Sequence, residues 1–158
     1  MPALRIGLLT TSDTRMREQD TAGAALHELC EERGWGIVVY HLVPDERDRI
    51  TEMLVGMADV DACDVILTAG GTGLGPRDVT PEATIEVSDR LVPGIAEAIR
   101  AESLTITKRA MLSRATAGVR GRTLIVNLPG SEKAVREAFA IVAGQLEHAV
   151  EMMAGGGH

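Results

Sequence analysis

The sequence predicts a three-layer α/β/α sandwich whose mostly parallel sheet contains one antiparallel strand. Short apolar runs, typical of buried strands, alternate along the chain with segments in which apolar residues recur at helical spacing. Near the C-terminal end two strand-like segments are separated by a short turn, which predicts a hairpin and therefore one reversed strand. The chain has 158 residues, a length that suits one domain.

The expected strands are short and aliphatic. They cover residues 4–10, the β-branched segment 36–43, residues 65–68, and the hairpin segments 115–119 and 123–126 around Gly121. Helices are expected over residues 21–33, from the turn at 44–48 through residue 57, from Pro81 to about residue 90, and over 94–103 and 132–153. Thr80 followed by Pro81 reads as an N-cap with proline at the first helical position. The domain is expected to cover residues 1–154, with 155–158 as a flexible tail.

The composition argues against several classes of protein. The net charge of −7 disfavours non-specific binding to nucleic acid, which depends on clustered cations. Cys30 and Cys63 are interpreted as small core residues, and the four His have no metal-ligand spacing. No apolar run could span a bilayer, and the N-terminal segment is typical of a strand rather than a signal peptide. The chain is therefore expected to be cytoplasmic, with no nucleic-acid or membrane partner.

A glycine-rich segment, TAGGTGLGPRDVTP at residues 68–81, joins a buried strand to a helix N-terminus. Glycine permits positive φ and lets backbone N–H groups approach an anion, and the helix dipole adds to that attraction. The segment is not a Walker A loop, because no Gly-Lys-Ser/Thr follows, and it is not the dinucleotide fingerprint, because the third glycine is misplaced. A plain turn is the alternative, but the glycine density and the Arg-Asp pair favour a phosphate-binding loop. The candidate ligands are Gly70, Gly71, Thr72, Gly73, Arg77 and Thr80.

Two aspartates are candidates for positioning a cation or a substrate. Asp78 follows Arg77 directly, and a carboxylate beside a phosphate loop is unfavourable unless it binds a cation or a ligand N–H group. Charge compensation at the helix N-terminus is the alternative for Asp78. Asp45 follows the second strand and could face the same crevice, although an ordinary N-cap explains it equally well from local sequence.

Other polar residues also lie at expected strand ends, where ligands bind in open α/β sheets. For each of them capping, solvation or simple exposure remains the alternative. Three such loops leave room for two phosphorylated ligands, or for a nucleotide and a partner. The further candidates are Ser12, Asp13, Ser113, Arg114, Asn127, Pro129, Gly130 and Ser131.

These motifs resemble those of the MogA/MoaB family of molybdenum cofactor biosynthesis proteins. The run TAGGTGLGPRDVTPEAT at residues 68–84 is very similar to the family signature. Shorter matches are TSDT at 11–14, DTAG at 20–23, VPDE at 43–46, MLSRATAGVRG at 111–121 and NLPGSEKAV at 127–135. The resemblance covers about residues 4–153, in the same order along the chain.

The resemblance implies a homotrimer that transfers AMP from ATP to molybdopterin with Mg²⁺ and releases pyrophosphate. The product later accepts molybdate, which implies a molybdenum-insertion protein as a possible downstream partner. The family's functional carboxylates map to Asp78 and Asp45, as catalytic residues and as Mg²⁺ ligands. Two alternatives remain open: a non-catalytic molybdopterin-binding or scaffold member of the family, and a phosphate-binding domain with a hydrolytic role.

Overall fold

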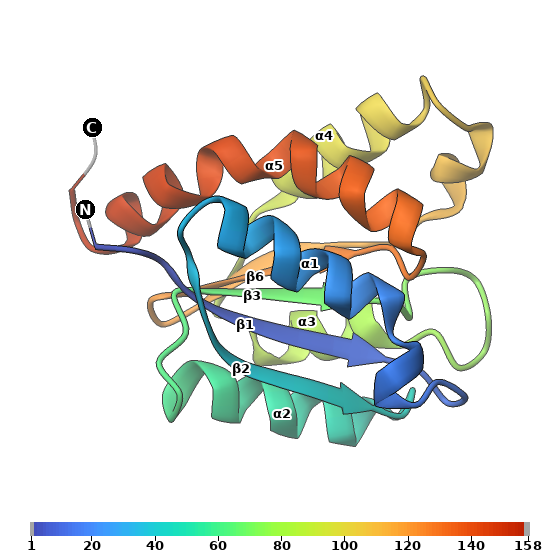
Figure 1. Ribbon diagram of the computed structural model, residues 1–158, viewed down its shortest axis with the longest axis horizontal. Coiled ribbons are helices and arrows are strands. Elements are labelled where there is room, and N and C mark those ends of the chain that lie inside the picture. Colours follow the sequence, from blue (N-terminus) through green and yellow to red (C-terminus); the bar gives the residue numbers. More distant parts are fainter. Residues whose placement is uncertain (1, 157–158) are drawn as a thin grey trace.

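The structure, a computed structural model, describes residues 2–156 of the chain (Figure 1). A six-stranded sheet lies between two layers of helices, which confirms the predicted three-layer sandwich. Of the predicted tail, Gly155 and Gly156 are hydrogen bonded to the last turn of the preceding helix, at 2.9 and 3.0 Å. Residues 157–158 of that tail lie outside the described residues.

The sheet has the strand order β2-β1-β3-β6-β5-β4. The strands β2, β1, β3 and β6 pair in parallel, whereas β5 runs antiparallel to both of its neighbours. Among the described strands, β5 is therefore the one reversed strand that the hairpin spacing predicts. The bounds are β1 (Arg5–Thr11), β2 (Gly36–Val43), β3 (Val65–Ala69), β4 (Arg90–Leu91), β5 (Ala117–Arg120) and β6 (Thr123–Leu128).

Helices cover both faces of the sheet because alternate strand residues point to opposite sides. In β1, Ile6 and Leu8 pack into the core beneath α1 (Thr21–Glu32), α4 (Pro93–Ser103) and α5 (Glu132–Met153). Leu9 packs into the core beneath α2 (Arg47–Asp59) and α3 (Thr80–Val87). Both cores are almost wholly aliphatic, as the scarcity of aromatic residues requires.

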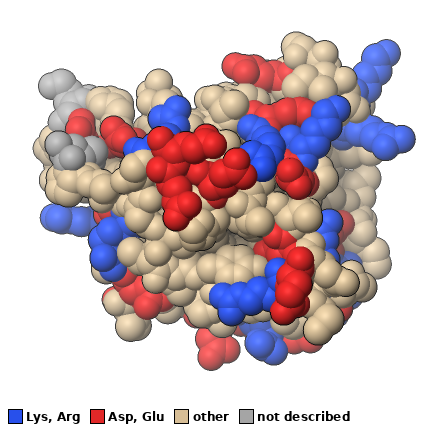
Figure 2. Space-filling model, in the orientation of Figure 1, with Lys and Arg blue, Asp and Glu red and all other residues tan. Residues whose placement is uncertain are grey.

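The outer surface over α1 and α5 carries acidic and basic side chains side by side (Figure 2). Arg136 of α5 pairs with Glu28 of α1 at 3.1 Å and with Glu132 of its own helix at 3.2 Å. Exposed ion pairs of this kind contribute little to stability, about 0–1 kcal/mol each. The packing of the aliphatic cores is therefore what holds the layers together.

Three local predictions are wrong. The helix α3 ends at Val87 rather than near residue 90, because Ser88 has extended backbone and its hydroxyl donates to Thr84 O at 2.6 Å. The strand β4 was missed, since two residues are too few to produce an alternating pattern. Thr80 is not the N-cap of α3: Val79 occupies that position, and the Thr80 hydroxyl contacts Thr11 instead.

The parallel strands bring four loops to one edge of the sheet. The carboxyl ends of β2, β1, β3 and β6 meet there, followed by residues 44–46, 12–20, 70–79 and 129–131. The arrowheads of β1, β2 and β3 mark this edge in Figure 1. None of the described helices has the length and apolar character needed to cross a bilayer.

Candidate functional site

A cavity of about 330 Å³ opens where these loops meet. We call it the acidic cavity, because three carboxylates line it. Side chains from the loop after β1 and from the loop after β2 face backbone of the glycine-rich loop across it. Its lining residues are Thr11, Ser12, Asp13, Thr14, Arg15, Asp45, Gly71, Asp78 and Gly130.

The glycine-rich loop approaches β1 so closely that side chains would not fit. Gly70 and Gly71 both have positive φ, +98° and +70°. A Cβ at Gly70 would lie 2.6 Å from the carbonyl oxygen of Thr11, and one at Gly71 would collide with the Thr80 hydroxyl. The Thr11 and Thr80 hydroxyls are hydrogen bonded to each other at 3.3 Å beneath this backbone. Glycine is therefore required at positions 70 and 71 both by close packing and by the positive φ of the backbone.

Asp45 has the least satisfied polar group of the site. Its Oδ1 is buried without a hydrogen-bond partner among the described residues. A Cβ at Gly71 would lie 3.3 Å from that oxygen, so Asp45 sits directly against the glycine-rich loop. Burial raises the pKa of Asp45, the charges of Asp13 and Asp78 act in the same direction, and the nearby Thr11 hydroxyl opposes them. An unpartnered buried carboxylate oxygen is unfavourable by itself and is suited to binding a cation or a donor.

Asp13 ties three of the loops together. It accepts two hydrogen bonds from the Arg77 guanidinium at 3.0 Å and one from the backbone N–H of Asp45 at 2.9 Å. Arg77 and the Asp45 amide lower the pKa of the Asp13 carboxyl. Arg77 is therefore already paired with a carboxylate, and a phosphate would have to share it.

Asp78 is hydrogen bonded to another residue of the glycine-rich loop. Its Oδ2 accepts the N–H of Gly75 at 2.9 Å, and its own N–H donates to Gly75 O at 3.0 Å. Its Oδ1 accepts no hydrogen bond from the described residues, and the side chain lines the acidic cavity. The geometry thus gives Asp78 a structural contact through one oxygen and leaves the other for a ligand.

A second cavity of about 390 Å³ lies on the other side of the glycine-rich loop. We call it the apolar cavity, because carbon atoms make up most of its wall. Five of the predicted site residues line it: Thr72, Gly73, Ser113, Pro129 and Ser131. Ser131 also caps α5 by accepting the N–H of Ala134 at 3.2 Å. Eleven of the sixteen predicted site residues therefore line one or other of two neighbouring cavities, which share the glycine-rich loop as a wall. The other five, which line neither, are Gly70, Arg77, Thr80, Arg114 and Asn127.

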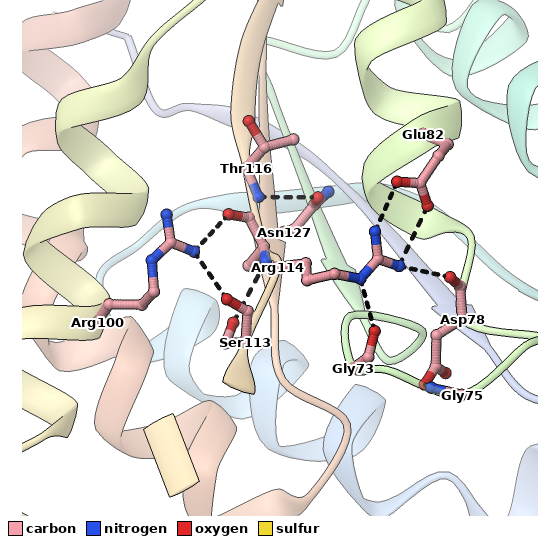
Figure 3. A network of polar contacts seen from close by, with 10 residues as sticks. Gly73, Gly75, Asp78, Glu82, Arg100, Ser113, Arg114, Thr116 and Asn127 are labelled. Atoms are coloured by element: carbon pink, nitrogen blue, oxygen red, sulfur yellow. Dashed lines mark hydrogen bonds and ion pairs between the residues drawn. The ribbon is translucent and has the colours of Figure 1, made fainter. Parts of the chain in front are cut away.

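Two predicted ligand residues are hydrogen bonded within the protein (Figure 3). Asn127 is 1% exposed, and its side chain donates to Thr68 and Thr84 and accepts the N–H of Thr116. Arg114, predicted as an anion ligand or as simply exposed, is partly buried. Its guanidinium is bonded to the glycine-rich loop and to Glu82.

Sequence reasoning missed several residues of the site. Thr11 lies under the glycine-rich loop, Arg15 donates to Gly130 O at 3.0 Å, and Arg100 donates to the carbonyl groups of Ser113 and Ala115. Thr11 belongs to the TSDT run, which was a usable signal. Nothing local marks Arg100, because its partners are more than ten residues away.

We expect alanine at Gly70 to destabilise the fold strongly. The free energy of unfolding should fall by roughly 2–5 kcal/mol, because positive φ costs about 1–2 kcal/mol and overpacking about 1–3 kcal/mol. Gly144→Ala is the matched control, since Gly144 is exposed within α5 and a Cβ there meets nothing within 4 Å. It should stabilise the protein by about 0.5–1 kcal/mol. Urea unfolding measures both, and equal effects of the two changes would contradict the packing argument.

Asp45→Asn should stabilise the fold at neutral pH. The raised pKa means that the ionised carboxylate is less favourable in the folded than in the unfolded chain. The gain should be complete above the raised pKa, shrink as the pH falls toward the ordinary aspartate value of about 3.9, and vanish below it. Asp59→Asn is the control of opposite sign, because Arg120 lowers the pKa of Asp59. Thermal unfolding from pH 3 to pH 7 would refute this if Asp45→Asn lost stability at pH 7.

Comparison with known proteins identifies relatives of this arrangement. A family model described as a probable molybdopterin binding domain matches residues 7–148. Molybdopterin adenylyltransferase of Helicobacter pylori is 38% identical over 98% of this chain and 90% of its own length. The molybdenum cofactor synthesis protein cinnamon of Drosophila melanogaster is 44% identical, but this chain spans only 26% of it.

Solved structures agree with these relatives. The molybdopterin biosynthesis enzyme MoaB from Thermus thermophilus superposes with a TM-score of 0.89 at 49% identity, covering 96% of this chain and 97% of that one. The Mog protein from Mycobacterium ulcerans superposes with a TM-score of 0.89 at 37% identity, covering 98% and 99%. The chain therefore belongs to the MogA/MoaB family of molybdenum cofactor biosynthesis proteins, as its motifs indicated.

Proposed function

We propose that this protein is a molybdopterin adenylyltransferase, which transfers AMP from ATP to molybdopterin and releases pyrophosphate. The observation that carries the proposal is the acidic cavity, which is lined by Asp45, with its buried and unpartnered Oδ1, together with Asp78 and Gly71. The Helicobacter pylori relative of similar length bears the name of this activity.

The reaction forms one bond to phosphorus and breaks another. A terminal oxygen of the molybdopterin phosphate attacks the α-phosphorus of ATP, and the bond from that phosphorus to the bridging oxygen of the β-phosphate breaks as pyrophosphate leaves. Such transfers depend mostly on positioning and on neutralising charge. In the proposal Asp45 and Asp78 orient the reacting groups, and N–H groups from Gly71 to Gly73 hold phosphate. The Gly70 N–H, which the sequence also suggested, is already donated to Leu128 O at 3.1 Å.

The two cavities provide separate places for two ligands. We propose that Ser12 and Asp13 line the pterin side, and that residues 129–131 line another edge of the site. The acidic and apolar cavities meet at the glycine-rich loop, since Gly71 lines one and Thr72 and Gly73 line the other. Ligands in the two cavities would therefore have their phosphates near the same backbone.

A magnesium ion suits the donors of the acidic cavity. Mg²⁺ prefers carboxylate oxygens and is often held by one or two of them together with substrate phosphates. Asp45 and Asp78 would hold it, and the described residues contain no cluster of three or more acidic, His or Cys groups that could bind a metal without such help. When bound, the ion would neutralise phosphate charge that three carboxylates would otherwise repel.

We also propose that the protein assembles as a homotrimer and passes its product to a molybdenum-insertion protein. Both proposals follow from the family resemblance. Sedimentation equilibrium tests the first, with a mass three times that of the chain, 16.8 kDa, as the expected result.

Pyrophosphate release tests the activity. With ATP, Mg²⁺ and molybdopterin together we expect release and an adenylylated product, and without molybdopterin we expect neither. Asp78→Ala should lower turnover by about 10²-fold or more, since misplaced reacting groups cost rate on that scale. Asp89→Ala is the matched control, because Asp89 also accepts a backbone N–H through Oδ2, from Gly121 at 2.7 Å, in the hairpin turn at the other end of the sheet.

The other outcomes distinguish the alternatives. Binding of molybdopterin without pyrophosphate release would point to a non-catalytic or scaffold protein. Release that does not need molybdopterin would point to a hydrolase. An Asp78→Ala variant as active as Asp89→Ala would remove Asp78 from the mechanism.

A further inference from the structure

Arg114 makes more side-chain hydrogen bonds to the backbone of the glycine-rich segment than any other described residue outside it. Its Nε donates to Gly73 O at 2.7 Å and its Nη2 to Asp78 O at 2.7 Å. Its Nη1 and Nη2 donate to the two carboxylate oxygens of Glu82, at 2.6 and 3.2 Å. Four of the five guanidinium N–H groups are therefore used (Figure 3).

These bonds fix the outer part of the loop, residues 73–78, which has few other hydrogen bonds to the rest of the protein. Gly70 and Gly71 are fixed by backbone bonds to Leu128 and Thr80, both at 3.1 Å. Beyond them the loop projects outward, and the Leu74 side chain at its tip is 66% exposed. Among the described residues, only Arg114 and the Arg77–Asp13 pair tie residues 73–78 to the rest of the protein by side-chain hydrogen bonds.

Glu82 fixes the position of the Arg114 guanidinium. It lies in the first turn of α3, four residues after Asp78, so it belongs to the helix and not to the loop. The Arg114 guanidinium lowers the pKa of Glu82, which keeps the pair ionised near neutral pH. The backbone N–H of Arg114 also donates to Thr72 O at 2.8 Å. Arg114 is thus hydrogen bonded both to helix α3 and to the glycine-rich loop.

We propose that Arg114 and Glu82 are positioning residues, which set the place of Asp78 for the adenylyl transfer without touching either substrate. The inference rests on the proposed function. A planar guanidinium can donate to Glu82 and to two loop carbonyl groups at once, whereas a lysine ammonium carries the same charge without that fork. The substitution Arg114→Lys therefore separates the effect of hydrogen-bond geometry from the effect of charge.

The test compares Arg114→Lys, Arg114→Met and Glu82→Gln with wild-type protein in steady-state kinetics. Both Arg114 variants should lose roughly 30- to 100-fold in kcat, as expected for a misplaced reacting group. Their KM values for ATP and molybdopterin should change by less than about 3-fold, because no ground-state contact is removed. Glu82→Gln should lose about 3- to 10-fold in kcat, because the amide removes the charge and keeps only one of the two acceptor oxygens.

Arg120→Lys is the matched control. Arg120 also makes a two-pronged contact with a carboxylate, that of Asp59 at 3.1 and 2.8 Å, and donates to Val87 O at 3.0 Å. It lies at the hairpin, remote from the site, so its kcat should stay within about 2-fold of wild type. A loss of kcat in Arg120→Lys equal to that in Arg114→Lys would overturn the proposal, because it would reflect general destabilisation.

Two further results would also overturn it. An Arg114→Lys variant with nearly wild-type kcat would mean that the charge alone matters. An Arg114→Met variant with unchanged kcat and a KM raised more than about 10-fold would make Arg114 a substrate ligand.

A second measurement does not depend on activity. Amide hydrogen exchange at Gly75 and Asp78, whose N–H groups are hydrogen bonded within the loop at 2.9 and 3.0 Å, should be at least about 10-fold faster in Arg114→Lys than in wild type, and unchanged in Arg120→Lys. Unchanged exchange in Arg114→Lys would overturn the proposal. If wild-type protein releases no pyrophosphate, the proposed function fails, while this exchange experiment still decides whether Arg114 orders the loop. If the Arg114 variants do not fold, Glu82→Gln carries both measurements.

Discussion

The close contact between the glycine-rich loop and the end of β1 is the constraint on which the site depends. Because Gly70 and Gly71 lack side chains, their backbone lies against Thr11 and Thr80 at distances that no other residue would allow. This contact brings the loop after β3 beside the loop after β1. It also places Asp45, which follows the neighbouring strand β2, against the same backbone. Every other contact in the site starts from that arrangement.

Charge in the site is distributed so that only some carboxylates are neutralised within the protein. Asp13 is matched by Arg77 and Glu82 by Arg114, each through two hydrogen bonds to one guanidinium. Asp45 has no such partner, and its pKa is raised. The carboxylate of Asp45 thus lowers the stability of the folded protein, and such unfavourable groups are common where a protein must bind or react. Asp45 and Asp78, which no guanidinium neutralises, both line the acidic cavity.

Most of the fold could be predicted from the sequence, because hydrophobic period and glycine positions report local conformation directly. The strand pattern and the hairpin spacing led to the correct layers and to the single reversed strand β5. The functions of individual side chains could not be predicted equally well. Asn127 and Arg114 look like ligands in isolation, but their partners Thr84 and Glu82 lie more than thirty residues away. Only the folded chain shows that these polar groups are already satisfied.

The two ends of the described chain lie together, on the side of the sheet opposite the glycine-rich loop (Figure 1). The chain enters β1 at its amino end, and the long helix α5 runs back from the site to finish near the same place. Additional domains joined at either end would extend away from both cavities. In the Drosophila melanogaster relative the matching region is 26% of a much longer protein. The placement of the termini makes such modular fusion compatible with an open site.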